Sequence, residues 1–175
     1  MNYKIRSVVQ ADEQKIFDLY KVVSKTIGGI AREEDEITSN YIKNNLDKSL
    51  KNGISLVIEH PDATSQLIAE IHCYQLEPKV FRHVLSELTI VIHPDFQGKG
   101  IGKALFIELL NQVKSKRKDI LRIELIARES NVNAIELYKS IRFKEEGRFE
   151  KRINNRDGSF EADIPMAWIN PGFTG

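Results

Sequence analysis

The sequence has little cysteine, almost no net charge and no long apolar run, and each scarcity excludes a class of protein. Cys73 is the only cysteine among 175 residues, so an internal disulfide is excluded and no Cys/His cluster has zinc-site spacing. Lys and Arg total 26 against 25 for Asp and Glu, which gives no electrostatic signature of nucleic acid or an anionic membrane. No apolar run is long enough to span a bilayer. The N-terminus lacks the apolar stretch of a signal peptide, so we expect a cytoplasmic protein with no nucleic-acid or membrane partner.

The remaining composition is that of an ordinary globular protein. Hydrophobic residues make up 41% and charged residues 29%, and the length is enough for one domain with a substantial core. Strand-like and helix-like segments interleave without strict βαβ alternation, an internal repeat or a long linker. We therefore predict a single α/β domain over residues 1–175, with a mixed, mostly antiparallel sheet flanked by helices.

The apolar pattern assigns each segment. We expect strands at 4–9, 54–59, 67–75, 85–93, 121–127, 147–153 and 160–169. Apolar residues at helical spacing predict one helix after Asp12 and a second that starts with the acidic run 33–36. The same spacing predicts helices at 101–116 and 131–141. We interpret Cys73 as core filling, because it lies within a strand-like run. The acidic run is interpreted as favourable charge at a helix start, and no metal site is predicted.

The most informative segment joins the strand expected at 85–93 to the helix that begins at Ile101. Its turn has glycine at three alternate positions, and Lys99 and Lys103 add positive charge. Glycine lets the backbone approach a ligand closely, and the free N–H groups and dipole of a helix start favour an anion. The turn is therefore suited to a phosphate or pyrophosphate, and a plain strand-to-helix turn with flexible glycines is the alternative.

Two features of this turn argue against a nucleotide-binding domain. The spacing G-x-G-x-G differs from the dinucleotide pattern G-x-G-x-x-G. Lys103 is followed by Ala104, where a P-loop has the Ser or Thr that binds magnesium. Affinity for ATP or NAD is therefore not expected.

Several segments resemble the GNAT superfamily of N-acetyltransferases. Residues 97–102, Gln-Gly-Lys-Gly-Ile-Gly, are similar to its signature Q/R-x-x-G-x-G/A. Residues 131–143 resemble its N-x-x-A-x-x-L-Y-x-x-x-G-F segment, at the expected separation of one helix and one strand. Residues 144–166 resemble the closing hairpin of members that act on amino acids, polyamines and related amines. The likeness covers 55–169, and the first fifty residues fit only in layout.

The resemblance implies that acetyl-coenzyme A binds between two strands that splay apart, within a core at about 85–143. In the family the turn binds the pyrophosphate through backbone N–H groups, and the preceding strand pairs with the pantetheine arm. Asn131 matches a position whose side chain contacts the cofactor, and a helix cap is an equally good interpretation. Carried over residue by residue, the other cofactor-binding positions are Ile90, Val91, Ile92, Gln97, Gly98, Lys99, Gly100, Ile101, Gly102 and Lys103.

The resemblance also implies direct transfer of the acetyl group to a primary amine of a small molecule, such as an amino acid or polyamine. Tyr138 matches the tyrosine proposed to protonate the departing thiolate, and a phenol stays protonated at neutral pH; a core tyrosine is the alternative. Glu87 resembles a position used as the base, directly or through water, although it is also consistent with an ordinary strand-end carboxylate. His72, His83 and His93 are weaker candidates. Some members have a glutamate five residues before the asparagine, and Ile126 occupies that position here.

Other interpretations remain open on the same fold. Acetylation of a protein N-terminus or lysine is the alternative activity, and a non-catalytic acyl-CoA sensor is a third. A homodimer is one expected assembly, because dimers are common in the family. Arg142 stands where the family has the glycine before Phe143, a position that often needs a left-handed backbone. Either Arg142 adopts that backbone or the turn differs.

Overall fold

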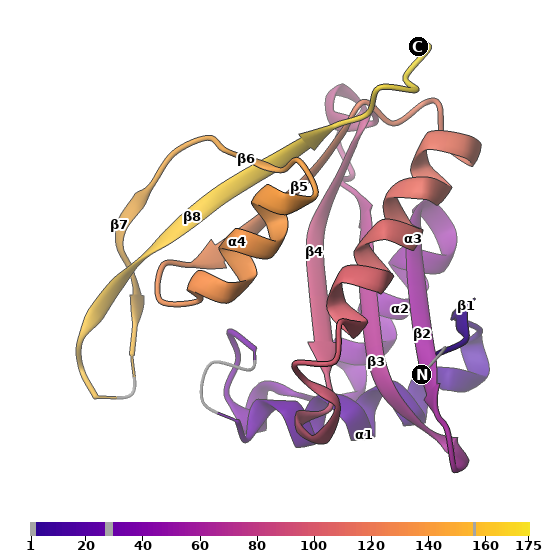
Figure 1. The fold of residues 1–175 in the computed structure, drawn as a ribbon, viewed down its shortest axis with the longest axis vertical. Coiled ribbons are helices and arrows are strands. Elements are labelled where there is room, and N and C mark those ends of the chain that lie inside the picture. Colours follow the sequence, from indigo (N-terminus) through magenta and orange to yellow (C-terminus); the bar gives the residue numbers. More distant parts are fainter. Residues whose placement is uncertain (1–2, 27–29, 156) are drawn as a thin grey trace.

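One mixed β-sheet with helices on both faces organises the chain, as Figure 1 shows for the computed structural model, which describes residues 3–26, 30–155 and 157–175. The strands are β1 (Ile5–Ser7), β2 (Gly53–His60), β3 (Ala63–Gln75), β4 (Val84–Ile92), β5 (Arg122–Arg128), β6 (Lys144–Glu145), β7 (Phe149–Asn154) and β8 (Phe160–Ile169). They are ordered β1-β2-β3-β4-β5-β8-β6, and β7 also pairs with β8. Every pairing is antiparallel except β4 with β5. The predicted α/β class and mostly antiparallel sheet are confirmed.

Two apolar cores lie on opposite faces of this sheet. Helices α1 (Glu13–Ser24) and α2 (Ser39–Asn52) pack against a cluster that includes Val57 and Val91. Helices α3 (Ile101–Lys116) and α4 (Val132–Ser140) pack against the larger cluster. Cys73 belongs to that larger cluster and is fully buried, as expected of core filling. In the part of the chain that the structure describes, no helix is both long and apolar enough to cross a bilayer.

The beginning of α2 differs from the prediction. The acidic run forms a separate 3₁₀ turn, Glu34–Glu36, and the α-helix starts only at Ser39. The Thr38 hydroxyl accepts a hydrogen bond from the Tyr41 N–H at 3.1 Å, so threonine caps this helix. Between them, Ile37 has an extended backbone and a buried side chain, which separates the acidic turn from the helix. The helix start predicted at 33–36 is therefore wrong.

The chain leaves α4 through a residue with left-handed backbone. Arg142 has φ +76°, and the following N–H, of Phe143, donates to the Tyr138 carbonyl at 2.9 Å. This geometry closes the helix and turns the chain towards β6. Of the two alternatives left open at this position, Arg142 adopts the left-handed backbone, at a steric cost of about 1–2 kcal/mol for a residue with a Cβ.

Strands β4 and β5 pair only where they begin. Val84 pairs with Arg122 and Leu85 with Ile123, and no further pair joins the two strands within the described residues. Beyond this point they diverge, which leaves one edge of β4 without a strand partner (Figure 1). Glu87 marks a β-bulge at the divergence, because β4 has one residue more than β3 between their flanking pairs. The fold thus opens a wedge at the carboxyl ends of β4 and β5.

Candidate active site

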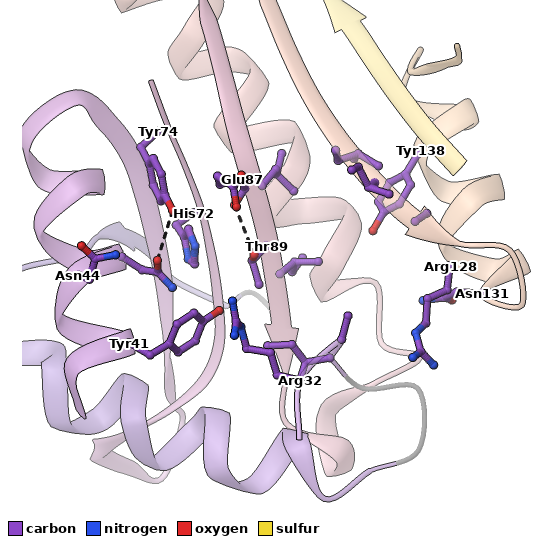
Figure 2. A pocket seen from close by; sticks show the side chains of 18 residues that line it. Arg32, Tyr41, Asn44, His72, Tyr74, Glu87, Thr89, Arg128, Asn131 and Tyr138 are labelled. Atoms are coloured by element: carbon purple, nitrogen blue, oxygen red, sulfur yellow. Dashed lines mark hydrogen bonds between the residues drawn. The ribbon is translucent and has the colours of Figure 1, made fainter. Parts of the chain in front are cut away.

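A cavity of about 420 Å³ lies in the wedge between β4 and β5. Figure 2 shows that its side chains come from both sides of the sheet: α2 and the residues before it on one side, α4 on the other. Both strands contribute to its walls as well. The cavity therefore connects the two faces of the sheet where the strands separate. Its polar lining residues are Arg32, Tyr41, Asn44, Asn45, His72, Tyr74, Glu87, Thr89, Arg128, Asn131 and Tyr138.

Tyr138 forms the α4 wall of the cavity. Its ring packs against two aromatic rings of the core, with centroids 5.1 Å from Phe106 and 6.1 Å from Phe143. Burial raises the pKa of the Tyr138 phenol to about 12. The hydroxyl therefore stays protonated at neutral pH and can donate a proton within the cavity.

Glu87 lies on the β4 bulge with φ +54°, a backbone that a residue with a Cβ rarely adopts. The Glu87 side chain is exposed and lines the cavity. The negative charge of Glu87 also acts on Tyr74: the pKa of the Tyr74 phenol is raised to about 12, mainly by burial and secondly by this charge. The bulge thus presents a carboxylate where the strands diverge.

A buried carboxylate–histidine pair lies behind the opposite wall. Glu70 is 1% exposed, and its carboxylate accepts hydrogen bonds from the hydroxyls of Tyr20 at 2.9 Å and Ser55 at 2.7 Å. The His72 Nδ1 lies 3.1 and 3.2 Å from the two Glu70 oxygens. His72 pairs with Thr89 of β4, and its ring lines the cavity. Since Nδ1 faces Glu70, Nε2 is the ring nitrogen left for a ligand.

Two arginines line the same cavity. The Arg32 guanidinium carbon lies 4.1 Å from the centroid of the Tyr41 ring. Arg128 forms an ion pair with Glu161, its Nη1 3.3 Å from a carboxylate oxygen, while its buried Nε has no hydrogen-bond partner within the described residues. Neither arginine was predicted from the sequence, because neither lies in a recognised motif position.

The glycine-rich turn follows β4 directly. Gly98 and Gly100 have φ +71° and +79°, and a Cβ at either would meet no described atom within 4 Å. Gly100 is the N-cap of α3, and no side chain of the described residues caps this helix. The first N–H groups of α3 are therefore open to a ligand. A Cβ at Gly102 would lie 3.3 Å from Ile92 and 3.7 Å from Leu137, so this helix start lies against the end of β4 and the side of α4.

The structure brings together only some of the residues predicted for the site. Glu87, Ile90, Asn131 and Tyr138 line the cavity. Asn131 also caps α4 by accepting the Ala134 N–H at 3.3 Å, as the cap interpretation predicted. The side chains of Val91 and Ile92 instead pack against the two cores. The turn residues, Gln97, Gly98, Lys99, Gly100, Ile101, Gly102 and Lys103, lie beyond the end of β4 and do not line the cavity, and neither do His83 and His93.

Two predicted turn side chains bind the chain itself. Gln97 Nε2 donates to the Ile92 carbonyl at 3.1 Å, which ties the turn to the end of β4. Lys99 Nζ donates to the Asp95 carbonyl at 2.8 Å and lies 4.9 Å from the centroid of the Phe96 ring. These contacts hold the turn in shape and leave ligand contacts to its backbone N–H groups.

Comparison with known proteins gives a consistent result. The family model "Acetyltransferase (GNAT) family" matches residues 19–143. The ribosomal protein bS18-alanine N-acetyltransferase of Escherichia coli K12 is 38% identical over 65 residues, which cover 35% of this chain and 43% of that relative, so the chain matches less than half of its length.

Solved structures share the fold over nearly the whole chain. A GNAT-family acetyltransferase from Streptococcus pneumoniae has a TM-score of 0.83 at 22% identity, covering 96% of this chain and 99% of that one. A phosphinothricin acetyltransferase from Sinorhizobium meliloti in complex with AcCoA has a TM-score of 0.85 at 18% identity, covering 99% and 91%. At these identities, the likeness shows the fold alone.

Proposed function

Because the chain belongs to the acetyltransferase (GNAT) family, we propose that it transfers the acetyl group of acetyl-coenzyme A directly to a primary amine of a small molecule. The observation that carries the proposal is the wedge cavity, which the Tyr138 phenol and the Glu87 carboxylate both line. Direct transfer needs an acid for the departing sulfur and a base for the attacking amine in one site. Cys73 is fully buried, and burial raises the pKa of its thiol to about 12, which disfavours a covalent acyl-enzyme.

Two features of the chain fit acetyl-coenzyme A. The uncapped start of α3 and the open space at Gly98 and Gly100 suit its pyrophosphate, which backbone N–H groups of residues 98–103 would bind. The unpaired edge of β4 at 90–92 suits its amide-bearing pantetheine arm. Bound there, the molecule supplies an activated acetyl thioester. Asn131, at the start of α4, lines the cavity and would orient the arm.

Two side chains of the protein then transfer the protons. Glu87 accepts a proton from the ammonium of the acceptor, directly or through water, and the freed amine nitrogen bonds to the acetyl carbon. Tyr138 Oη donates its proton to the sulfur as the carbon–sulfur bond breaks. The nitrogen then loses its second proton, which returns to the Tyr138 phenolate through water, and Glu87 releases the first proton to solvent. The products are an amide, a free thiol and one proton, so atoms and charge balance without a covalent enzyme intermediate.

The test is release of free thiol from acetyl-coenzyme A by the purified protein, across amino acids, polyamines, aminoglycosides and short peptides. Amine-dependent release with a small molecule supports the proposal and identifies the acceptor class. Tight binding of acetyl-coenzyme A without release across the panel would instead favour the acyl-CoA sensor.

A peptide N-terminus is the second candidate acceptor. The observation that favours it is the 38% identity to an enzyme named for acetylating the alanine of a ribosomal protein. The peptides in the panel distinguish the two candidates, because a protein-directed enzyme would acetylate peptides in preference to free amino acids.

The Gly100→Ala variant tests the role of the turn. Its φ of +79° strains any residue with a Cβ by about 1–2 kcal/mol, and the added methyl occupies space that the pyrophosphate needs. We expect the Kd for acetyl-coenzyme A, measured by calorimetry, to rise at least tenfold. Gly158→Ala is the matched control, because Gly158 has φ +81° and open surroundings in the β7–β8 turn. An equal loss of affinity in both variants would contradict the pyrophosphate assignment.

The identity of the base is tested by Glu87→Gln and His72→Gln. We expect Glu87→Gln to lower kcat/KM about tenfold, because it removes the carboxylate that accepts the proton of the amine. His72→Gln retains an amide that can donate to Glu70, so the buried carboxylate keeps a partner. A tenfold or larger loss of kcat/KM in His72→Gln, with the rate retained in Glu87→Gln, would assign the base to His72 instead.

A further inference from the structure

Arg32 places an unneutralised positive charge in the half of the cavity that is lined by α2 and the residues before it, which we call the acceptor side. Its guanidinium stacks on the Tyr41 ring at 4.1 Å, and no described residue forms an ion pair or hydrogen bond with it. Figure 2 shows the guanidinium directed between Tyr41 and Thr89, on the same side of the cavity as His72 and Tyr74. Stacking on one face leaves the N–H groups at the edge of the guanidinium free to donate.

The charges that line the cavity favour an anion over a second cation. Arg32 contributes a positive charge that no described carboxylate pairs with, whereas Arg128 is paired with Glu161, and Glu87 is the one carboxylate among the described lining residues. The remaining titratable groups there are His72 and the phenols of Tyr41, Tyr74 and Tyr138. A polyamine has several ammonium groups and needs several carboxylates to balance them. This cavity offers one carboxylate, which the proposed chemistry already uses as a base.

We propose that the acceptor is a small amine that also bears a carboxylate, as an amino acid does, and that Arg32 binds this carboxylate. This inference rests on the proposed function, because it names the substrate class of the same cavity. The planar guanidinium matches a carboxylate with two parallel hydrogen bonds, a geometry that a lysine ammonium cannot reproduce. Binding the carboxylate would fix the position of the neighbouring amine, so Arg32 determines specificity and does not act on a reacting atom.

There is room for the rest of such a molecule. A second cavity, of about 620 Å³, shares Arg32 and Arg128 with the first and extends to the β7–β8 hairpin. It is lined by groups of both charges, including Glu36, Arg152 and Glu161. Arg32 thus lies between the wedge, where the acetyl group is transferred, and a polar space that would hold the acceptor's side chain.

The experiment measures thiol release with each amino acid, with its carboxamide, and with polyamines. For the wild type, kcat/KM should be at least tenfold higher for the acid than for the amide. Arg32→Gln should raise KM for the acid about 10- to 100-fold, because the variant loses a charged hydrogen-bonded pair with the carboxylate. The KM for the amide should change less than threefold. Arg32→Lys should recover only part of the loss. Arg148→Gln is the charge control, because Arg148 is already paired with Glu129 and Glu150 outside both cavities.

The outcomes separate this inference from the proposed function. If polyamines or amides are acetylated with the same kcat/KM as the acids, the carboxylate subsite is overturned while the acetyltransferase activity stands. The same conclusion follows if Arg32→Gln impairs acetylation of the acid and the amide equally. If no amine is acetylated, the proposed function fails, and calorimetric titration with the same amino acids and amides decides the subsite. Binding of acids that Arg32→Gln abolishes supports the subsite, and absence of binding overturns it.

Discussion

Replacement of Tyr138 by phenylalanine should lower kcat about 100- to 1,000-fold, within the range for loss of a general acid. The ring would remain packed against Phe106 and Phe143, so the change removes one oxygen and little packing. Burial already raises the phenol pKa to about 12, which keeps the proton on the oxygen throughout the neutral range. We therefore expect kcat to fall at every pH between 6 and 9, measured as thiol release at saturating substrates.

Two measurements separate this chemical role from a structural one. The Kd for acetyl-coenzyme A and the Tm should change little in Tyr138→Phe. Tyr74→Phe removes a phenol from the opposite wall, where the hydroxyl donates to Asn45 at 3.3 Å, and should cost less than tenfold in kcat. A Tyr138→Phe enzyme with an unchanged rate, or equal losses in both variants, would remove Tyr138 from the mechanism.

The parts of the fold that sequence predicted best are those specified by local signals. Helix 101–116 and strand 160–169 have the predicted bounds, because apolar periodicity and adjacent turns define both ends. The motif position of Arg142 indicated a left-handed backbone as one of two alternatives, and Arg142 adopts it. The start of α2 was not predictable, because the acidic run and Thr38 are both helix-start signals in the sequence. The buried side chain of Ile37 separates the two in the structure.

The acceptor side of the site was less predictable than the donor side. Tyr138, Asn131 and the glycine turn lie in motifs, whereas Arg32 and Tyr41 reach the cavity only because the chain around α2 folds against β3 and β4. The pairing of Glu70 with His72 could have been predicted from the sequence. They are two residues apart in a strand, which places them on one face, and a buried acid next to an apolar run requires partners. Those partners, Tyr20 and Ser55, are distant in sequence and could not be read from it.

Replacement of Phe106 by alanine should reduce the free energy of unfolding by about 3–5 kcal/mol, the usual cost of truncating a buried phenylalanine. Phe106 is fully buried on α3, and its ring contacts both Tyr138 and Phe143. The cavity left behind would lie directly under the proposed acid. Urea unfolding measures the loss, and the exposed neighbour Ile107 supplies the control, since Ile107→Ala should change stability by about 0.5 kcal/mol or less.

A milder variant links this packing to catalysis. Phe106→Leu keeps most of the apolar volume and should cost under about 1.5 kcal/mol, so the protein stays folded. It nevertheless removes the flat ring against which Tyr138 packs, at 5.1 Å between centroids. If that ring positions the phenol, kcat should fall several-fold while the Kd for acetyl-coenzyme A is unchanged, because misplacing a catalytic group costs rate. An unaltered kcat in a destabilised Phe106→Leu protein would show that α4 alone positions Tyr138, and that Phe106 contributes to stability only.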